Sequence, residues 1–116
     1  YKLDNLVYIV DYNKLSSGHP TNEIIYLEPL KEKLSSFGYH VIEIDGHNME
    51  QILGALSEAK ETKGKPTFIV ANTVKGKGVS FMENVPKWHS SGLSDEEYEI
   101  AMKDLTEKEE ELAHAV

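Results

Sequence analysis

Cysteine is absent from the 116 residues of this sequence, which excludes a disulfide framework, a thiolate metal site and a cysteine nucleophile. Long apolar runs are also missing: no stretch approaches the roughly 20 residues that cross a membrane, and no signal peptide is recognisable. Basic charge is scarce, because 12 Lys and Arg stand against 20 Asp and Glu, for a formal net charge of −8. Nucleic-acid backbones require clustered positive charge. We therefore expect a cytoplasmic protein that binds neither nucleic acid nor a membrane.

The composition that remains is ordinary for a globular protein. Hydrophobic residues make up 40% and charged residues 28% of the chain, which fits one domain or a piece of one. The first residue is Tyr1 and not Met, and a strongly apolar segment begins as early as Leu6. We expect the sequence to be a section cut from a longer chain.

Alternating periodicities predict the secondary structure. Three segments rich in apolar and β-branched residues predict strands, and three segments with apolar residues at every third or fourth position predict helices. The first strand is a continuous apolar run, which is typical of a strand covered on both faces. In chain order the predicted elements are strand 6–10, helix 27–37, strand 39–46, helix 49–59, strand 66–74 and a helix from 95 onward.

Local signals place the ends of the helices. Gly38 suits the left-handed position that ends the first helix. Asn48 is a suitable N-cap for the second helix, and Gln51 three residues later makes a weak capping box. Ser94 and Glu97 form a full capping box for the last helix. That helix is strongly acidic, and we expect its charges to face solvent.

Strands that alternate with helices predict a parallel sheet with right-handed crossovers. The expected fold is a three-layer, doubly wound, mostly parallel α/β sheet. Three strands are fewer than the five or six that are typical of a sheet, and open edges invite pairing. We therefore expect only part of such a domain in this sequence.

In a parallel sheet, the loops that follow the strands emerge at one edge, where α/β proteins bind ligands. Each of these loops also has an ordinary structural explanation. Asn13 is a common turn former, the loop "KGKG" lacks the P-loop pattern, and His89 beside Trp88 suits a packed aromatic pair. The polar and charged residues in these loops are Asp11, Asn13, Lys14, His19, Asp45, His47, Lys75, Lys77 and His89.

Three segments, taken in order, carry a family resemblance: "YKLDNLVYIVDYNKL", "LEPLKEKLSSFGYHVIEIDGHNMEQI" and "GKPTFIVANTVKGKGVSFMENVPKWH". Together they resemble the thiamine-diphosphate-binding domain of transketolase, and especially its separate N-terminal subunit. The similarity runs from Tyr1 to about His89. It implies that residues 1–92 are the C-terminal half of that domain and that residues 93–116 are an acidic helix of the same domain.

The resemblance also implies the site residues. The family binds the cofactor's diphosphate through Mg²⁺ (or Ca²⁺), using Gly-Asp-Gly and, later in the chain, an Asn side chain with the backbone carbonyl two residues on. These last two ligands correspond to Asn13 and Leu15. His89 corresponds to a histidine that approaches the diphosphate and the substrate, where it donates hydrogen bonds or moves protons as a catalytic residue.

A complete enzyme of this family transfers two-carbon ketol units between sugar phosphates in the pentose phosphate pathway. The resemblance therefore implies that the partner is a pyrimidine-binding, C-terminal transketolase subunit, in a dimer or heterotetramer. The Gly-Asp-Gly segment and the family's catalytic Glu are not in this sequence. We accordingly expect the 116-residue chain alone to have no activity.

Two alternatives remain open at this stage. The first is a non-catalytic α/β remnant that binds no cofactor, which is favoured by Ser17, Gly18 and His19 in place of the family's usual Ile-Asp-Gly. The second keeps the cofactor but changes the reaction, because deoxyxylulose-phosphate synthase and dehydrogenase E1 subunits share the fold. The match through "EIDGHN" favours transketolase.

Overall fold

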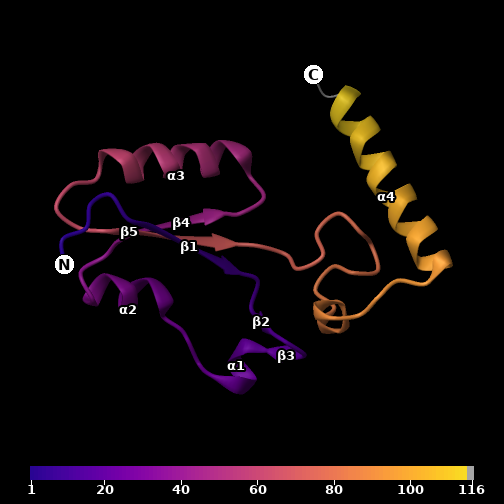
Figure 1. Cartoon of the computed structure of the whole chain (residues 1–116), viewed down its shortest axis with the longest axis horizontal. Coiled ribbons are helices and arrows are strands. Elements are labelled where there is room, and N and C mark those ends of the chain that lie inside the picture. Colours follow the sequence, from indigo (N-terminus) through magenta and orange to yellow (C-terminus); the bar gives the residue numbers. More distant parts are fainter. Residues whose placement is uncertain (115–116) are drawn as a thin grey trace. The chain divides into compact units, whose positions relative to one another are not determined.

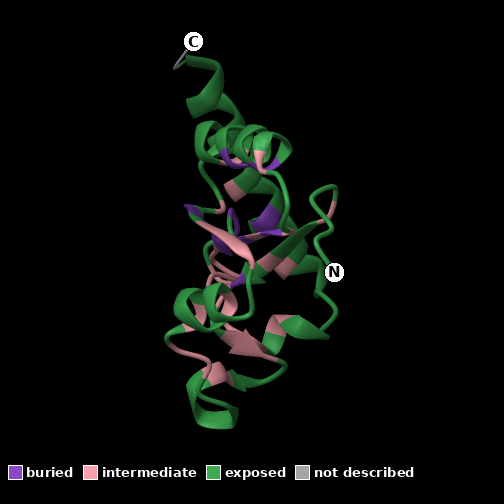
Figure 2. Ribbon diagram, turned by 90° about the vertical axis from the view of Figure 1, so that its left-hand side faces the viewer, coloured by how far each residue is buried: buried purple, intermediate pink, exposed green. Residues whose placement is uncertain are grey.

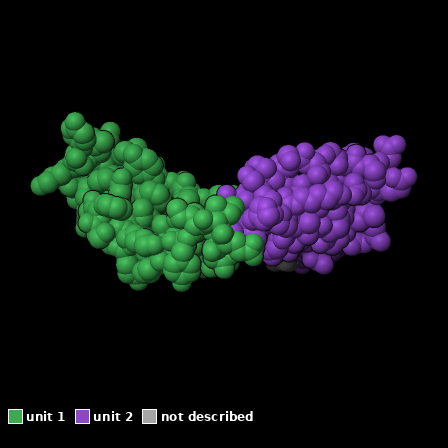
Figure 3. Space-filling model, turned by 90° about the horizontal axis from the view of Figure 1, so that it is seen from below, with its two compact units in different colours: residues 1–14, 21–73 green, residues 15–20, 74–116 purple. Residues whose placement is uncertain are grey.

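A computed structural model describes residues 1–114 of the chain. It divides into two compact units (Figure 3). The first unit comprises Tyr1–Lys14 and Thr21–Thr73, and the second comprises Leu15–Pro20 and Val74–Val116. Each unit is described separately below. The sequence-based division at residue 92 falls inside the second unit and stays a prediction.

The first unit contains a parallel three-stranded sheet in the order β1-β5-β4. The strands are β1 Val7–Tyr12, β4 His40–Asp45 and β5 Thr67–Asn72. Helices α2 Leu30–Ser36 and α3 Met49–Glu61 lie on opposite faces of this sheet (Figure 1). The predicted three-layer α/β fold with a parallel sheet is confirmed.

The register of the sheet aligns the carboxyl ends of its three strands. Tyr12 at the end of β1 lies opposite Asn72 at the end of β5. Asp45 at the end of β4 lies opposite the same Asn72 from the other side. The segments that leave β1, β4 and β5 therefore start from one edge of the sheet, as the alternating pattern predicted.

The core of this unit lies between β5 and α3. The central strand β5 contributes Ile69 and Ala71, which pack with Ile44 of β4 and Ala55 of α3. Figure 2 shows the buried segments in purple, within the sheet and on the side of α3 that faces the sheet. Small alanines on α3 allow its backbone to approach the branched side chains of the sheet closely.

The prediction that strand β1 is buried on both faces is wrong for this chain. Val7 and Tyr8 are exposed, and Ile9 keeps 62% of its surface in solvent. Helices α2 and α3 pack mainly against β4, so the edge strand β1 has little cover on either face. The apolar sequence of β1 is that of a central strand, whereas its neighbours here are those of an edge strand.

Helix α2 begins at Leu30 and not at residue 27, because Pro29 takes an extended conformation at its N-cap and disfavours a helical residue before it. The end predicted at Gly38 is confirmed by its φ of +89°. Asn48 caps α3 by accepting a hydrogen bond from the Gln51 amide. The Gln51 side chain, however, accepts from the Asp45 amide, so the reciprocal half of a capping box is missing.

The sequence left the segment after β1 without regular structure, but the structure shows short elements there. Strands β2 Leu15–Ser16 and β3 His19–Pro20 form a two-stranded antiparallel hairpin. Helix α1 Thr21–Ile24 follows it. These elements have only two to four residues each, which is too short for periodicity to reveal them.

In the second unit, the 3₁₀ helix η1 Pro86–His89 precedes the long helix α4 Asp95–His114. The predicted capping box is confirmed, since the Ser94 amide donates to Glu97 and the Glu97 amide donates to the Ser94 hydroxyl. Within residues 1–114, none of the helices combines the length and the apolar character needed to span a membrane.

Two carboxylates of the second unit accept backbone hydrogen bonds from the loop before η1. Asp104 of α4 accepts from the Ser80 amide at 2.7 Å and so holds the helix to this loop, whereas Glu83 accepts from the Gly78 amide at 3.1 Å within the loop itself. Hydrogen bonds from Ser80 lower the pKa of Asp104, and the bond from Gly78 lowers the pKa of Glu83. Both carboxylates are therefore more acidic in the folded chain than in the unfolded chain.

This predicts that acid weakens the second unit. A carboxylate with a lowered folded pKa stabilises the fold above its unfolded pKa, and that stabilisation is lost as the pH falls from the unfolded pKa through the lower folded pKa. Asp104→Asn should flatten the fall in stability over this range while lowering stability at pH 7. Urea unfolding followed by circular dichroism at a series of pH values measures the slope. An unchanged slope in the variant would contradict the assignment.

Candidate functional site at the carboxyl edge of the sheet

Asn13, Asp11 and Thr73 meet where β1 and β5 end. The Asn13 side-chain nitrogen donates to Asp11 Oδ1 at 3.3 Å, and the Thr73 hydroxyl donates to the same oxygen in a short hydrogen bond. Asp11 therefore accepts from both Asn13 and Thr73 and connects the turn after β1 with the residue after β5. The other polar atom of the Asn13 side chain is its amide oxygen, which is the type of atom that a hard cation binds.

Tyr12, one residue before Asn13, is buried and makes a strong hydrogen bond. Its hydroxyl donates to Glu28 Oε1 at 2.6 Å, and the other oxygen of Glu28 accepts from the Leu30 amide at 3.2 Å. The hydrogen bond to Glu28, with burial, raises the pKa of Tyr12 to about 12. The same bond lowers the pKa of Glu28. The pair therefore stays a phenol donor and a carboxylate acceptor at neutral pH.

The end of β4 is organised by a local turn. Asp45 Oδ1 accepts from the His47 amide at 2.9 Å, which is the ordinary turn role of an aspartate. Gly46 is required here, because a Cβ would lie 2.5 Å from the methyl group of Thr73 and 3.2 Å from the Asn72 carbonyl oxygen. These contacts explain Asp45 and Gly46 as structural residues that bring β4 and β5 together at this edge.

Leu15 and His89, the other two predicted site residues, belong to the second unit. Leu15 begins the β2–β3 hairpin, and His89 is the last residue of η1 and is exposed. Its neighbour Trp88 packs edge-to-face on Phe81, with ring centroids 5.2 Å apart, and donates to the Phe81 carbonyl at 3.1 Å. The ring of Trp88 is thereby fixed in the loop, and the imidazole of His89 is open to solvent.

The oxygen atoms at Asn13 and Leu15 are of a type that could bind a cation carrying a diphosphate. Within the described residues 1–114, no three or more His, Asp or Glu side chains gather as a metal site. Asn13 and Leu15 instead offer a neutral amide oxygen and a neutral main-chain carbonyl. Such oxygens suit a small hard cation that already carries the negative oxygens of a diphosphate.

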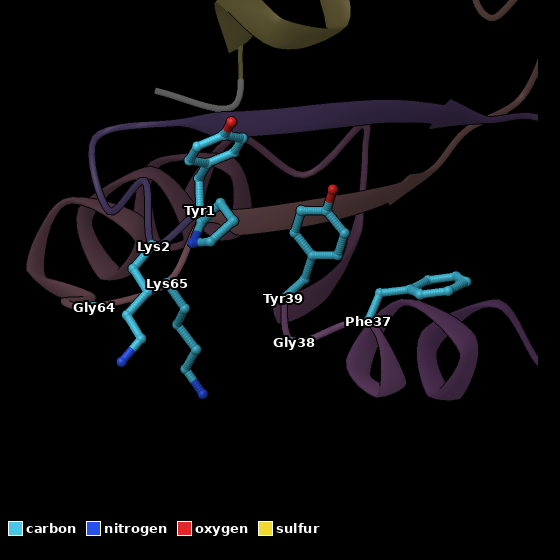
Figure 4. Close-up of a pocket in the computed structure, with 8 residues that line it drawn as sticks. Tyr1, Lys2, Phe37, Gly38, Tyr39, Gly64 and Lys65 are labelled. Atoms are coloured by element: carbon cyan, nitrogen blue, oxygen red, sulfur yellow. The ribbon is translucent and has the colours of Figure 1, made fainter.

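A pocket of about 480 Å³ lies at the opposite, amino edge of the sheet (Figure 4). Aromatic side chains and two lysines line it together with the glycines of two turns. In Figure 4 the Tyr39 ring points toward the strands, the Phe37 ring points away from the other labelled side chains, and the chains of Lys2 and Lys65 extend away from the sheet. Its lining includes no carboxylate, imidazole or amide side chain.

Sequence reasoning identified Asn13 but missed Tyr12, Glu28 and Thr73. Sequence analysis could have found Thr73, because this residue directly follows β5 at the edge already predicted to carry the site. It could not have found Glu28, because Glu28 lies 16 residues from Tyr12 and no local pattern pairs residues so far apart. The hydrogen bond between the two joins parts of the chain that only the tertiary fold brings together.

Comparisons with known proteins agree with this architecture. Residues 1–112 match the family described as the transketolase thiamine diphosphate binding domain. An apulose-4-phosphate transketolase subunit from Phocaeicola vulgatus is 40% identical over 112 residues, covering 97% of this chain and 40% of the relative. The 6-deoxy-6-sulfo-D-fructose transketolase subunit SqwG of a Clostridium species is 45% identical over 108 residues, covering 93% of this chain and 39% of the relative.

A solved transketolase from Campylobacter jejuni shows the same fold. It superposes with a TM-score of 0.83 and 32% sequence identity, covering 90% of this chain and 16% of that chain. The chain belongs to the transketolase family, in its thiamine diphosphate binding domain. It spans about two fifths of the length of the subunit relatives that it matches.

Proposed function

We propose that this chain is part of the thiamine-diphosphate-binding subunit of a transketolase, which moves a two-carbon ketol unit between sugar phosphates. The observation that carries the proposal is the parallel sheet whose carboxyl edge presents Asn13, within a family match over residues 1–112. The names of the two relatives support a transferase that works on sugar derivatives and is built from separate subunits. The pentose phosphate pathway and the cytoplasm are the expected setting.

In this proposal Asn13 and Leu15 hold the Mg²⁺ (or Ca²⁺) ion that carries the cofactor's diphosphate. Asn13 supplies its amide oxygen, while its amide nitrogen donates to Asp11, and Leu15 supplies its main-chain carbonyl. His89 donates to the diphosphate or moves a proton at the substrate hydroxyl, and its solvent-exposed position suits both tasks. Thiamine diphosphate, when bound, supplies the carbanion-stabilising chemistry for cleaving and forming the carbon–carbon bond.

The partner is proposed to be the pyrimidine-binding, C-terminal transketolase subunit, in a dimer or heterotetramer. Two features support an incomplete domain: the open edge strand β1 and its exposed Ile9. Residues 1–92 would be the C-terminal half of the cofactor domain, and residues 93–116 its acidic last helix. The missing metal carboxylate would come from the rest of the same polypeptide, and the catalytic Glu from the partner.

A reconstitution experiment tests this function. The full-length subunit that contains this chain, mixed with the pyrimidine-binding subunit, thiamine diphosphate and Mg²⁺, should convert a ketose phosphate and an aldose phosphate into the exchanged pair of sugars. Neither of the two subunits by itself should do so, nor should the 116-residue chain, because the catalytic groups are divided between chains. Turnover by the isolated 116-residue chain would overturn the proposal.

Calorimetry separates this function from a non-catalytic remnant. Micromolar, Mg²⁺-dependent binding of thiamine diphosphate to the reconstituted protein would exclude the remnant, whereas absent or millimolar binding would support it (affinities of about −8 and −4 kcal/mol). The same preparation distinguishes the related reactions, since deoxyxylulose-phosphate synthase activity would require pyruvate as donor.

A further inference from the structure

The two residues that flank Asn13 each make a hydrogen bond to a residue further along the first unit. On its C-terminal side, the Lys14 carbonyl accepts from the Thr21 amide at 2.9 Å, which closes the excursion of residues 15–20. On its N-terminal side, the Tyr12 hydroxyl donates to Glu28, which closes the longer excursion of residues 13–27. Both contacts join residues of the same unit. Asn13 is thus held close to the points where the chain leaves this unit, at Lys14, and re-enters it, at Thr21.

The segment that receives Tyr12 is itself held firmly. Glu28 accepts from the Leu30 amide at the start of α2. The Lys33 ammonium group donates to the carbonyls of Tyr26 and Leu27, at 3.3 and 2.9 Å. Glu28 is therefore a fixed acceptor, and a fixed acceptor can position the residue that donates to it.

The backbone beside Asn13 needs such support. Lys14 has a φ of +61°, a left-handed conformation that is unfavourable for a residue with a side chain. A conformation of this kind persists only where surrounding contacts determine it. Tyr12 is buried, and its backbone carbonyl also accepts from the Thr73 amide at 3.4 Å. The Tyr12–Glu28 bond is the side-chain contact that holds this turn from outside the β-sheet.

We propose that Tyr12 and Glu28 are positioning residues for the cofactor's metal–diphosphate group: their hydrogen bond holds the turn that presents Asn13. This inference rests on the function proposed above. The pair does not touch the reacting atoms in this proposal, so it sets the affinity for cofactor and metal and not the rate of the chemical step.

The test uses Tyr12→Phe in the full-length subunit, assembled with its partner. The concentrations of thiamine diphosphate and Mg²⁺ that give half-maximal activity should rise about tenfold, equivalent to ~1.4 kcal/mol, while kcat at saturating cofactor stays unchanged. Glu28→Gln keeps an acceptor oxygen for the phenol and should show a smaller rise. Glu58→Gln is the control, because it alters an equally short 2.6 Å contact with His40 far from this edge.

A second readout needs no cofactor. In the unliganded subunit, Tyr12→Phe should speed up amide hydrogen exchange in residues 13–27 and leave the exchange of β5 unchanged. The control Glu58→Gln should leave the exchange of residues 13–27 unchanged. If exchange is unchanged, the positioning role is refuted even when the enzyme is an active transketolase. If exchange speeds up but no variant binds thiamine diphosphate, the turn is held as described and the cofactor assignment is the part that fails. A fall in kcat with unchanged half-saturation would also overturn the positioning role.

Discussion

Replacing Asn13 with alanine in the reconstituted full-length enzyme should raise the Mg²⁺ and thiamine diphosphate concentrations for half-maximal activity by about 10- to 100-fold, the range seen when support of a metal site is lost. The variant removes one of the two oxygens that we propose this chain offers the cation. Asn13 is partly exposed, and its hydrogen bond to Asp11 is long at 3.3 Å, so the fold should survive the change.

The contrast with His89 makes this result specific. His89→Ala should chiefly lower kcat and should change the cofactor dependence less than Asn13→Ala does, because His89 is proposed to move a proton at the substrate and to donate to the diphosphate, but not to bind the metal. Asn22→Ala is a matched control, since Asn22 is an exposed residue of α1. Titrations of activity against cofactor, at fixed and varied Mg²⁺, separate the three variants. An Asn13→Ala enzyme with unchanged cofactor dependence would show that the metal-ligand assignment is wrong.

Gly76→Ala should destabilise the loop that carries His89 more than any other single methyl addition in that loop. Gly76 has a φ of +72°, and a Cβ there would lie 2.6 Å from the carbonyl oxygen of Met82. The left-handed conformation costs a side chain about 1–2 kcal/mol, and overpacking adds about 1–3 kcal/mol. The obstructing atoms are the carbonyl group and the Cβ of Met82, whose positions are fixed by the backbone, so no rotamer change relieves the contact.

Two glycines supply the controls for this prediction. Gly92→Ala meets no atom within 4 Å and has no left-handed φ, so it should be nearly neutral. Gly64→Ala also meets no atom but has a φ of +75°, so it isolates the conformational cost in the other unit. Urea unfolding of the three variants measures the differences. Equal stability of Gly76→Ala and Gly92→Ala would contradict the steric argument.

The sequence alone was sufficient for features that depend on neighbouring residues. Alternating strand and helix patterns predicted the parallel α/β fold, because burial on both faces of a strand and on one side of a helix leaves different periodicities. The capping residues Asn48 and Ser94 and the helix end at Gly38 were also predicted, since each acts within three or four positions of its own chain. The resemblance located Asn13 directly after β1.

Contacts between distant segments were decided by the tertiary structure. Three contacts join residues far apart in the sequence: the bond of Tyr12 to Glu28, the bond of Thr73 to Asp11, and the close approach of Gly46 to β5. The exposure of Ile9 likewise reflects which elements cover β1. The sequence determined which segments are the longer strands and helices, because local periodicity encodes them, whereas the short β2, β3 and α1 carry no such pattern. Only the tertiary structure determined which side chains meet at the carboxyl edge, because that depends on strand order and register.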